Sequence, residues 1–176
     1  MMNFFIENLD DKMAKQILSW KYEKPYDFYN NEVSEEALNE LLDGSYKAIT
    51  TDNGDLVGPT EKVKERHFFS ALDLIGFFCI GQTAQIPIGH QYGVYREDCV
   101  DIGLGMHPDY VGKGYGFDFC TYIIKNINEN FEGMALRLSV ATFNKRAIHL
   151  YEKLGFVKKD KFNTPRAEFM TMMMDR

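Results

Sequence analysis

A glycine-rich stretch near the middle of the sequence has the residue types of an anion-binding loop. The segment Met106–Ile124 reads MHPDYVGKGYGFDFCTYII and places Gly112, Gly114 and Gly116 between an apolar run and a helix-like pattern. Such glycines allow positive φ angles and let an anion approach the backbone. The first N–H groups of a helix are unpaired and attract negative charge, and Lys113 adds a positive charge. Alone, the stretch fits a phosphate-binding loop and a tight strand-to-helix turn equally well.

Two well-known nucleotide-binding motifs do not fit this stretch. A P-loop requires Lys and then Ser or Thr after its last glycine, and Tyr115 and Phe117 stand where these should be. The dinucleotide fingerprint G-x-G-x-x-G has Phe117 at its last glycine position. The loop therefore belongs to neither class, although the physical reasons for anion binding at a helix N-terminus still apply.

A second stretch, ATFNKRAIHLYEKLGF, supplies polar groups at another helix mouth. Asn144 opens the helical pattern, and Tyr151 follows seven residues later, about two turns along the same face. Together with HPDYVGKGYG, this segment resembles the GCN5-related N-acetyltransferase (GNAT) superfamily over about residues 99–156. The chain departs from the family pattern at Val111, where Arg or Gln is usual, so backbone N–H groups are expected to hold the anion.

The resemblance implies that acetyl-CoA is the co-substrate and that its acetyl group passes directly to a primary amine. It implies that the strand end Leu104–Met106 pairs with the pantetheine arm, and that the Met106 N–H polarises the thioester carbonyl. The glycine loop is expected to bind the pyrophosphate, and Asn144 to lie beside the arm. The expected cofactor contacts are Leu104, Gly105, Met106, Val111, Gly112, Lys113, Gly114, Tyr115, Gly116, Phe117, Asn144 and Ala147.

Two residues are catalytic candidates under this resemblance. Asp101, on the strand before the glycine loop, is expected to be the general base, directly or through water, since Ser139 stands where other members have a carboxylate. Its alternative is a carboxylate paired with a neighbouring cation. Tyr151 is the expected acid for the CoA thiolate, and its alternative is a buried core aromatic. Asn144 also fits an ordinary helix N-cap.

The segment WKYEKPYDFYNN is the expected acceptor wall, because the family builds its acceptor cleft from this region. Trp20, Tyr26 and Tyr29 are the expected substrate contacts, since aromatic faces attract a cationic amine. Packing beneath a long loop explains the same residues. The acceptor is expected to be a small-molecule or peptide amine. A non-catalytic acyl-CoA-binding regulatory module of the same fold is the alternative function.

The elements that must position these residues can be read from hydrophobic periodicity and capping signals. Helices are expected over residues 10–20, 34–44, 114–132 and 144–155, and strands over 3–9, 46–50, 72–81, 99–107, 134–142, 156–162 and 167–175. Residues 51–70 are expected to be a long hairpin connection, with extra strand near HFFSA. The order predicts a mixed α/β fold, with helices flanking a mostly antiparallel sheet that has one parallel crossover at the glycine loop.

A core stripe is expected along the helix that follows the glycine loop. Apolar residues recur there at three- and four-residue steps, which is typical of a buried helix face. The expected stripe is Phe117, Cys120, Ile124, Ile127 and Phe131.

Overall composition limits the number of domains, the binding partners and the cellular locations that fit the sequence. The 176 residues, 45% of them hydrophobic, predict a single folded domain over 1–176. The net charge of −6 argues against nucleic acid and anionic membranes as partners. Three irregularly spaced cysteines and an acidic N-terminus predict a cytoplasmic protein with reduced thiols. No metal is expected, because the four histidines lack ligand spacing, and a homodimer is compatible with the family.

Overall fold

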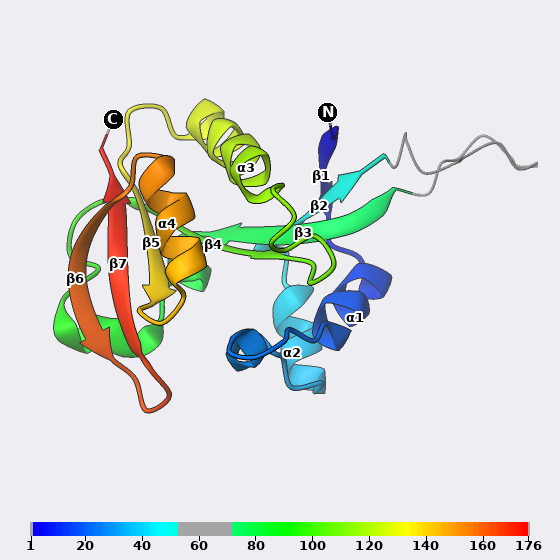
Figure 1. Ribbon diagram of the computed structural model, residues 1–176, viewed down its shortest axis with the longest axis horizontal. Coiled ribbons are helices and arrows are strands. Elements are labelled where there is room, and N and C mark those ends of the chain that lie inside the picture. The colour runs from blue at the N-terminus through cyan, green and yellow to red at the C-terminus, as the bar shows by residue number, and fades with distance from the viewer. Residues whose placement is uncertain (1, 53–71, 176) are drawn as a thin grey trace, which may run out of the picture.

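The computed structural model describes residues 2–52 and 72–175 (Figure 1). Its strands are β1 (Phe4–Asn8), β2 (Tyr46–Thr51), β3 (Asp73–Ile80), β4 (Val100–Met106), β5 (Leu136–Ala141), β6 (Val157–Asn163) and β7 (Glu168–Met174). Its helices are α1 (Asp11–Ser19), α2 (Glu35–Leu41), α3 (Gly116–Asn130) and α4 (Lys145–Lys153), with 3-10 turns η1 (Tyr26–Tyr29), η2 (Gly81–Ala84) and η3 (Pro87–Tyr92). The extra strand expected near HFFSA, and all but the first two residues of the hairpin connection expected over residues 51–70, lie outside the described residues.

The strands form one mixed sheet in the order β1-β2-β3-β4-β5-β7-β6. Of the strand pairs that the structure describes, β4–β5 is parallel and the others are antiparallel. Because parallel neighbours need a crossover, the chain leaves β4, passes through the glycine loop and α3, and returns as β5. The predicted fold class and the position of its parallel crossover are confirmed.

Helices cover both faces of this sheet (Figure 1). The main core joins α3 and α4 to the sheet through apolar side chains, among them Phe119, Ile123 and Ile148, which meet Ile102 and Leu138. A second cluster of buried side chains holds α1 and α2, and Phe77 of β3 packs against it. The two layers fix the sheet, and with it the strand ends from which functional side chains must project.

Polar side chains cap three helices, at the residues with which the expected helices over 10–20, 34–44 and 144–155 begin. Asp10 accepts a hydrogen bond from the Met13 N–H at 2.7 Å, Ser34 accepts one from Ala37 at 3.1 Å, and Asn144 accepts one from Ala147 at 3.1 Å. Each cap satisfies an N–H group that the first turn of a helix leaves unpaired. These local signals explain why the helix starts agree with the expectation from sequence.

Helix α3 corrects the expected core stripe. It begins at Gly116, and its buried residues are Phe119, Cys120, Ile123 and Ile127. Phe117, expected in the core, is 46% exposed. Phe117 instead lies in the first turn of α3 and is not part of the buried core.

The parallel strands separate before they end. β4 and β5 pair at Val100–Leu136, Asp101–Arg137 and Ile102–Leu138, and no pairing joins the remaining residues of the two strands. β4 instead stays paired with β3 as far as Met106. A wedge therefore opens between the C-terminal halves of β4 and β5.

Candidate active site

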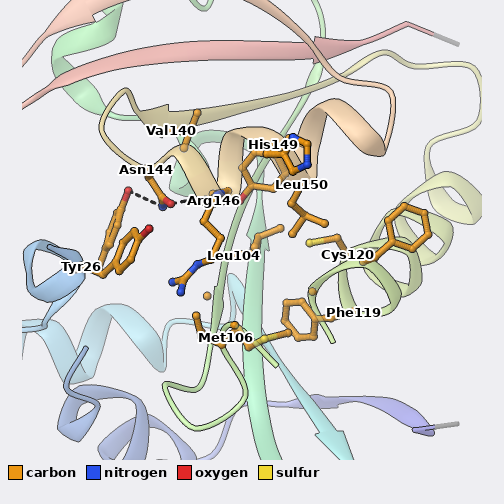
Figure 2. Close-up of a pocket in the computed structure, with 18 of the residues that line it drawn as sticks. Tyr26, Leu104, Met106, Phe119, Cys120, Val140, Asn144, Arg146, His149 and Leu150 are labelled. Carbon is orange, nitrogen blue, oxygen red and sulfur yellow. Dashed lines mark hydrogen bonds between the residues drawn. The ribbon is translucent and has the colours of Figure 1, made fainter. Parts of the chain in front are cut away.

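A pocket of about 750 Å³ occupies the wedge between β4 and β5. The ends of α3 and α4 border it on one side, and the segment between α1 and α2 borders it on the other (Figure 2). Residues from each of these elements line it: Tyr22, Tyr26, Tyr29, Asn31, Phe77, Leu104, Gly105, Met106, Val111, Gly112, Gly114, Gly116, Phe117, Phe119, Cys120, Ser139, Val140, Asn144, Arg146, Ala147, His149, Leu150, Tyr151 and Lys153.

The edge of β4 presents free backbone groups to this pocket. The His107 N–H donates to Ile75 of β3, and the Val100 N–H donates to Ala135 on the other side. Since backbone groups alternate in direction along a strand, those of Leu104 and Met106 point away from β3, into the wedge. The Met106 carbonyl accepts a hydrogen bond from the Tyr22 hydroxyl at 2.9 Å. The N–H and C=O of Leu104 and the N–H of Met106 have no hydrogen-bond partner among the described residues and remain available to a ligand.

The glycine loop presents a run of backbone N–H groups. Gly112 and Gly114 have φ angles of 76° and 91°, which glycine adopts without strain. From residue 112 to residue 118, no N–H donates a well-formed hydrogen bond to any residue that the structure describes. Such a run beside a helix N-terminus is the arrangement that binds phosphate groups.

Arg146 lies between the glycine loop and the acceptor segment. One of its guanidinium nitrogens, Nη1, is 3.6 Å from the position that a Cβ on Gly112 would take. Its Cζ lies 4.1 Å from the centre of the Tyr26 ring, and Figure 2 shows the side chain extending toward the space between Tyr26 and Met106. A fixed cation therefore stands beside the unpaired N–H groups.

Helix α4 brings Asn144 and Tyr151 to the pocket, as the sequence predicts. Asn144 caps the helix with its carbonyl and donates from Nδ2 to the Tyr29 hydroxyl at 3.2 Å. The Tyr151 hydroxyl makes no hydrogen bond to a described residue, and its ring packs against Phe156. Burial raises the pKa of the Tyr151 phenol well above its ordinary value, so the phenol stays protonated.

A model of the acetyltransferase (GNAT) family matches residues 14–156 of the sequence. The chain belongs to this family. Like the other members of this family, it is an acetyl-CoA-dependent acyltransferase. No curated protein sequence matches the chain.

Solved structures share this GNAT fold. A spermidine N-acetyltransferase chimera of Vibrio cholerae SpeG and hSSAT superposes with a TM-score of 0.63 at 17% identity, covering 98% of this chain and 95% of that one. The aminoglycoside acetyltransferase AAC(6')-Ib, solved with coenzyme A, gives 0.65 at 14% identity, covering 99% and 95%. An uncharacterized Bacillus halodurans protein gives 0.71 at 14% identity, covering 99% and 84%.

Some predicted contacts of this GNAT chain lie outside the pocket. Lys113 and Tyr115 belong to the loop but do not line the cavity. Trp20, an expected substrate contact, is only 5% exposed and packs against Phe77 and His107, with ring centres 5.9 and 5.0 Å away. It belongs to the core beneath α1, because aromatic content alone does not tell which rings of a segment face inward.

Asp101 lies in a buried ion pair, not in the pocket. Arg137 donates to its two carboxylate oxygens at 2.6 and 2.9 Å, and Gln85 donates to Oδ2 at 2.6 Å. Asp101 is 3% exposed and does not line the pocket. Successive side chains of a strand point to opposite faces of the sheet. Ile102 lies on the face covered by α3 and α4, so the Asp101 side chain lies on the opposite face. This position does not favour the expected role of general base.

Sequence reasoning missed Arg146, and it placed Tyr22 in the expected acceptor wall without predicting its contact with Met106. Arg146 stands two residues after the Asn144 cap, in the first turn of the helix, where a side chain is directed back toward the helix mouth; that spacing was a usable signal. Tyr22 gave no comparable signal, because its contact with Met106 joins positions 84 residues apart. Among residues 2–52 and 72–175, no cluster of three or more His, Cys, Asp or Glu could hold a metal, and no helix could span a membrane.

Proposed function

We propose that this protein transfers the acetyl group of acetyl-CoA to a primary amine by direct attack in the wedge between β4 and β5. One observation carries the proposal: Leu104 and Met106, with their free backbone groups, and Tyr151 line the same cavity as Gly112, Gly114, Gly116 and Phe117, which belong to the unpaired N–H run. Acetyl-CoA supplies the activated acyl group when bound. The roles below belong to residues of this chain.

The glycine loop and Arg146 bind the pyrophosphate in this proposal. The loop offers neutral donors, and Arg146 adds a charge-assisted hydrogen bond from beside Gly112. Val111 lines this part of the pocket and has no polar side-chain group. Arg146 therefore supplies the positive charge that the pocket-lining residues of the loop do not have.

The Met106 N–H polarises the acyl carbonyl at the point of attack. A backbone donor fixed by the sheet costs no reorganisation when charge develops on the oxygen. Leu104 provides both a donor and an acceptor two residues earlier on the same edge, which suits an amide of the cofactor arm.

Tyr151 donates to the departing sulfur. A CoA thiol has a pKa near 8.5, about that of a free thiol, and burial raises the pKa of Tyr151 above its ordinary value. Full proton transfer from the phenol is therefore uphill, and the favoured role is a hydrogen bond that stabilises the thiolate.

Burial also raises the pKa of the Cys120 thiol, to about 12, so Cys120 is not a thiolate nucleophile and direct attack is favoured.

The amine reaches the acyl carbon without a carboxylate base. No Asp or Glu among the described residues lines the pocket, and Asp101 is held by Arg137. An alkyl amine with a pKa near 10 is neutral in about one molecule in a thousand at pH 7, a cost of about 4 kcal/mol. We propose that the proton leaves to solvent before attack.

The decisive experiment measures CoA release and amide formation with the full chain, acetyl-CoA and a set of amines and peptides. Acetyl-CoA should raise the melting temperature by mass action, and at least one amine should yield a stoichiometric N-acetyl product. Stabilisation by acetyl-CoA with no transfer to any amine would instead favour the non-catalytic acyl-CoA-binding module. A missing thermal shift at saturating acetyl-CoA would contradict both functions.

We also propose a cytoplasmic location, which the free thiols Cys79, Cys99 and Cys120 favour.

A further inference from the structure

We propose that the acceptor is a primary monoamine with an apolar or aromatic body, and that amines carrying further positive charges are poor acceptors. The inference rests on the proposed function. In the step, the neutral amine nitrogen forms a bond to the acetyl carbon, the carbon–sulfur bond breaks, the CoA sulfur leaves with the bonding electron pair, and one amine proton passes to solvent.

Aromatic rings form the acceptor end of the pocket. Tyr22, Tyr26 and Tyr29 line it from the segment after α1, and Phe77 lines it from β3. The Tyr22 hydroxyl already donates to Met106, and the Tyr29 hydroxyl already accepts from Asn144. These two polar tips are therefore occupied, and the rings offer mainly apolar surface to the body of a substrate.

Burial keeps these phenols neutral. It raises the pKa of Tyr22 to about 12 and raises the pKa of Tyr29 above its ordinary value. The Tyr22 and Tyr29 phenols therefore carry no negative charge at pH 7–8 that could attract a second ammonium group.

The charges that face the pocket are positive. Arg146 extends into it, and Lys153 lines its α4 side. Among the lining residues that the structure describes there is no Asp or Glu. The acidic side chains of the neighbouring segment, Glu23, Asp27 and Glu32, are exposed and do not line the cavity. A second ammonium group of a substrate would lose water without gaining a counter-charge from these walls.

The ring that could best hold a cation is already taken. The Arg146 guanidinium lies 4.1 Å from the centre of Tyr26, within the range of a cation–π contact. A polyamine would have to displace this guanidinium or place a like charge beside it. The acceptor end thus differs in kind from a site built to hold a polycation.

The test compares hexylamine with 1,6-diaminohexane, which have the same length and similar amine basicity and differ in one ammonium group. With the full chain, saturating acetyl-CoA and pH 8, kcat/KM for hexylamine should exceed that for the diamine by about tenfold or more, because like charges at a binding surface discriminate at this level. Phenethylamine should be preferred over spermidine and kanamycin.

A designed carboxylate should remove most of the preference for the monoamine. Asn31 lines the acceptor end, so Asn31→Asp should lower the hexylamine-to-diamine ratio about tenfold. Asn39→Asp makes the same change on exposed α2, outside the pocket, and should leave the ratio within about twofold of the wild-type value. Melting temperatures with and without acetyl-CoA verify that both variants fold and bind it.

The outcomes separate the two proposals. Efficient transfer to 1,6-diaminohexane, spermidine or kanamycin, at or above the rate for the monoamines, would overturn this inference and leave the proposed function intact. An unchanged ratio in Asn31→Asp would also overturn it. Acetyl-CoA binding without transfer to any amine would overturn both.

Discussion

Asp101 and Arg137 form a two-point ion pair inside the sheet, with Nε–Oδ1 and Nη2–Oδ2 distances of 2.6 and 2.9 Å. The residues are partners across β4 and β5, one pair before the last pairing at Ile102–Leu138. Both side chains are almost fully buried. The pair therefore stabilises the point from which the two strands diverge.

Asp101→Asn should destabilise the fold while sparing the chemistry. Removing one partner leaves the Arg137 charge buried and unpaired, which lowers the free energy of unfolding by about 3 kcal/mol in urea titrations. The folded variant should keep kcat within about threefold, because a residue outside the pocket makes no transition-state contact. Asp11→Asn, in the exposed pair with Lys15, should cost about 0.5 kcal/mol or less. A loss of kcat by two orders of magnitude in stably folded Asp101→Asn would restore Asp101 as the base.

Gly114→Val should strongly weaken cofactor binding. Gly114 has a φ of 91°, and a Cβ there would meet no atom within 4 Å, so the harm comes from backbone strain and not from a clash. The loop should lose its N–H geometry, and the Kd of acetyl-CoA should rise about tenfold or more by calorimetry. Gly133→Val is the matched control, since Gly133 also has a positive φ, 77°, and free space. It should lower stability to a similar degree without changing affinity.

Val111→Arg should leave acetyl-CoA affinity intact or improve it. Val111 lines the pocket beside the loop, and an added guanidinium can donate to phosphate oxygens there. If this variant lost binding while Gly114→Val retained it, the loop would not hold the pyrophosphate.

Arg146→Ala should weaken acetyl-CoA binding and reduce its sensitivity to salt. The guanidinium beside Gly112 contributes one charge-assisted contact, so Kd should rise about tenfold at low ionic strength. Arg166→Ala is the control, because Arg166 stacks on Phe28 at 4.5 Å and does not line the pocket. Equal losses in both variants would mean that the effect comes from ring packing.

Tyr151→Phe should lower kcat and leave the Kd of acetyl-CoA unchanged. The substitution keeps the ring against Phe156 and removes only the hydroxyl, at a cost in kcat of about a hundredfold. Because burial raises the pKa of Tyr151, wild-type kcat/KM should rise with pH as the amine loses its proton, with no fall by pH 10. A variant with wild-type kcat would rule out a role for this hydroxyl.

Tyr22 should make the fold sensitive to alkaline pH. Burial raises the pKa of its phenol to about 12, so above pH 10 the unfolded chain loses a proton that the folded chain keeps. Relative to Tyr22→Phe, the wild-type protein should lose about 1.4 kcal/mol of stability between pH 8 and 11. Urea titrations at both pH values measure this. A constant difference between the two proteins would contradict the burial of this hydroxyl.

Local signals explain what could be predicted from the sequence. The caps at Asp10, Ser34 and Asn144 involve residues three apart, and the glycine loop lies within one stretch. Tertiary contacts decided the rest. The partners of Asp101 lie 16 and 36 residues away, so its sequence surroundings did not distinguish a base from a buried ion pair. In the aromatic segment, the same composition supplied Trp20 to the core and Tyr26 to the pocket.

The hydrogen bond from Tyr22 to Met106 gives the free edge of β4 a direction. It occupies the last outward carbonyl of the strand and leaves a lone donor at Met106, while Leu104 keeps a donor and an acceptor. The pattern of donors and acceptors therefore fixes the register of a ligand that lies along this edge. A ligand shifted by one residue would not meet these groups, because backbone groups alternate in direction along a strand. Under the proposed function, this single contact would set both the wall for the amine and the alignment of the acyl donor, because Tyr22 comes from the expected acceptor segment.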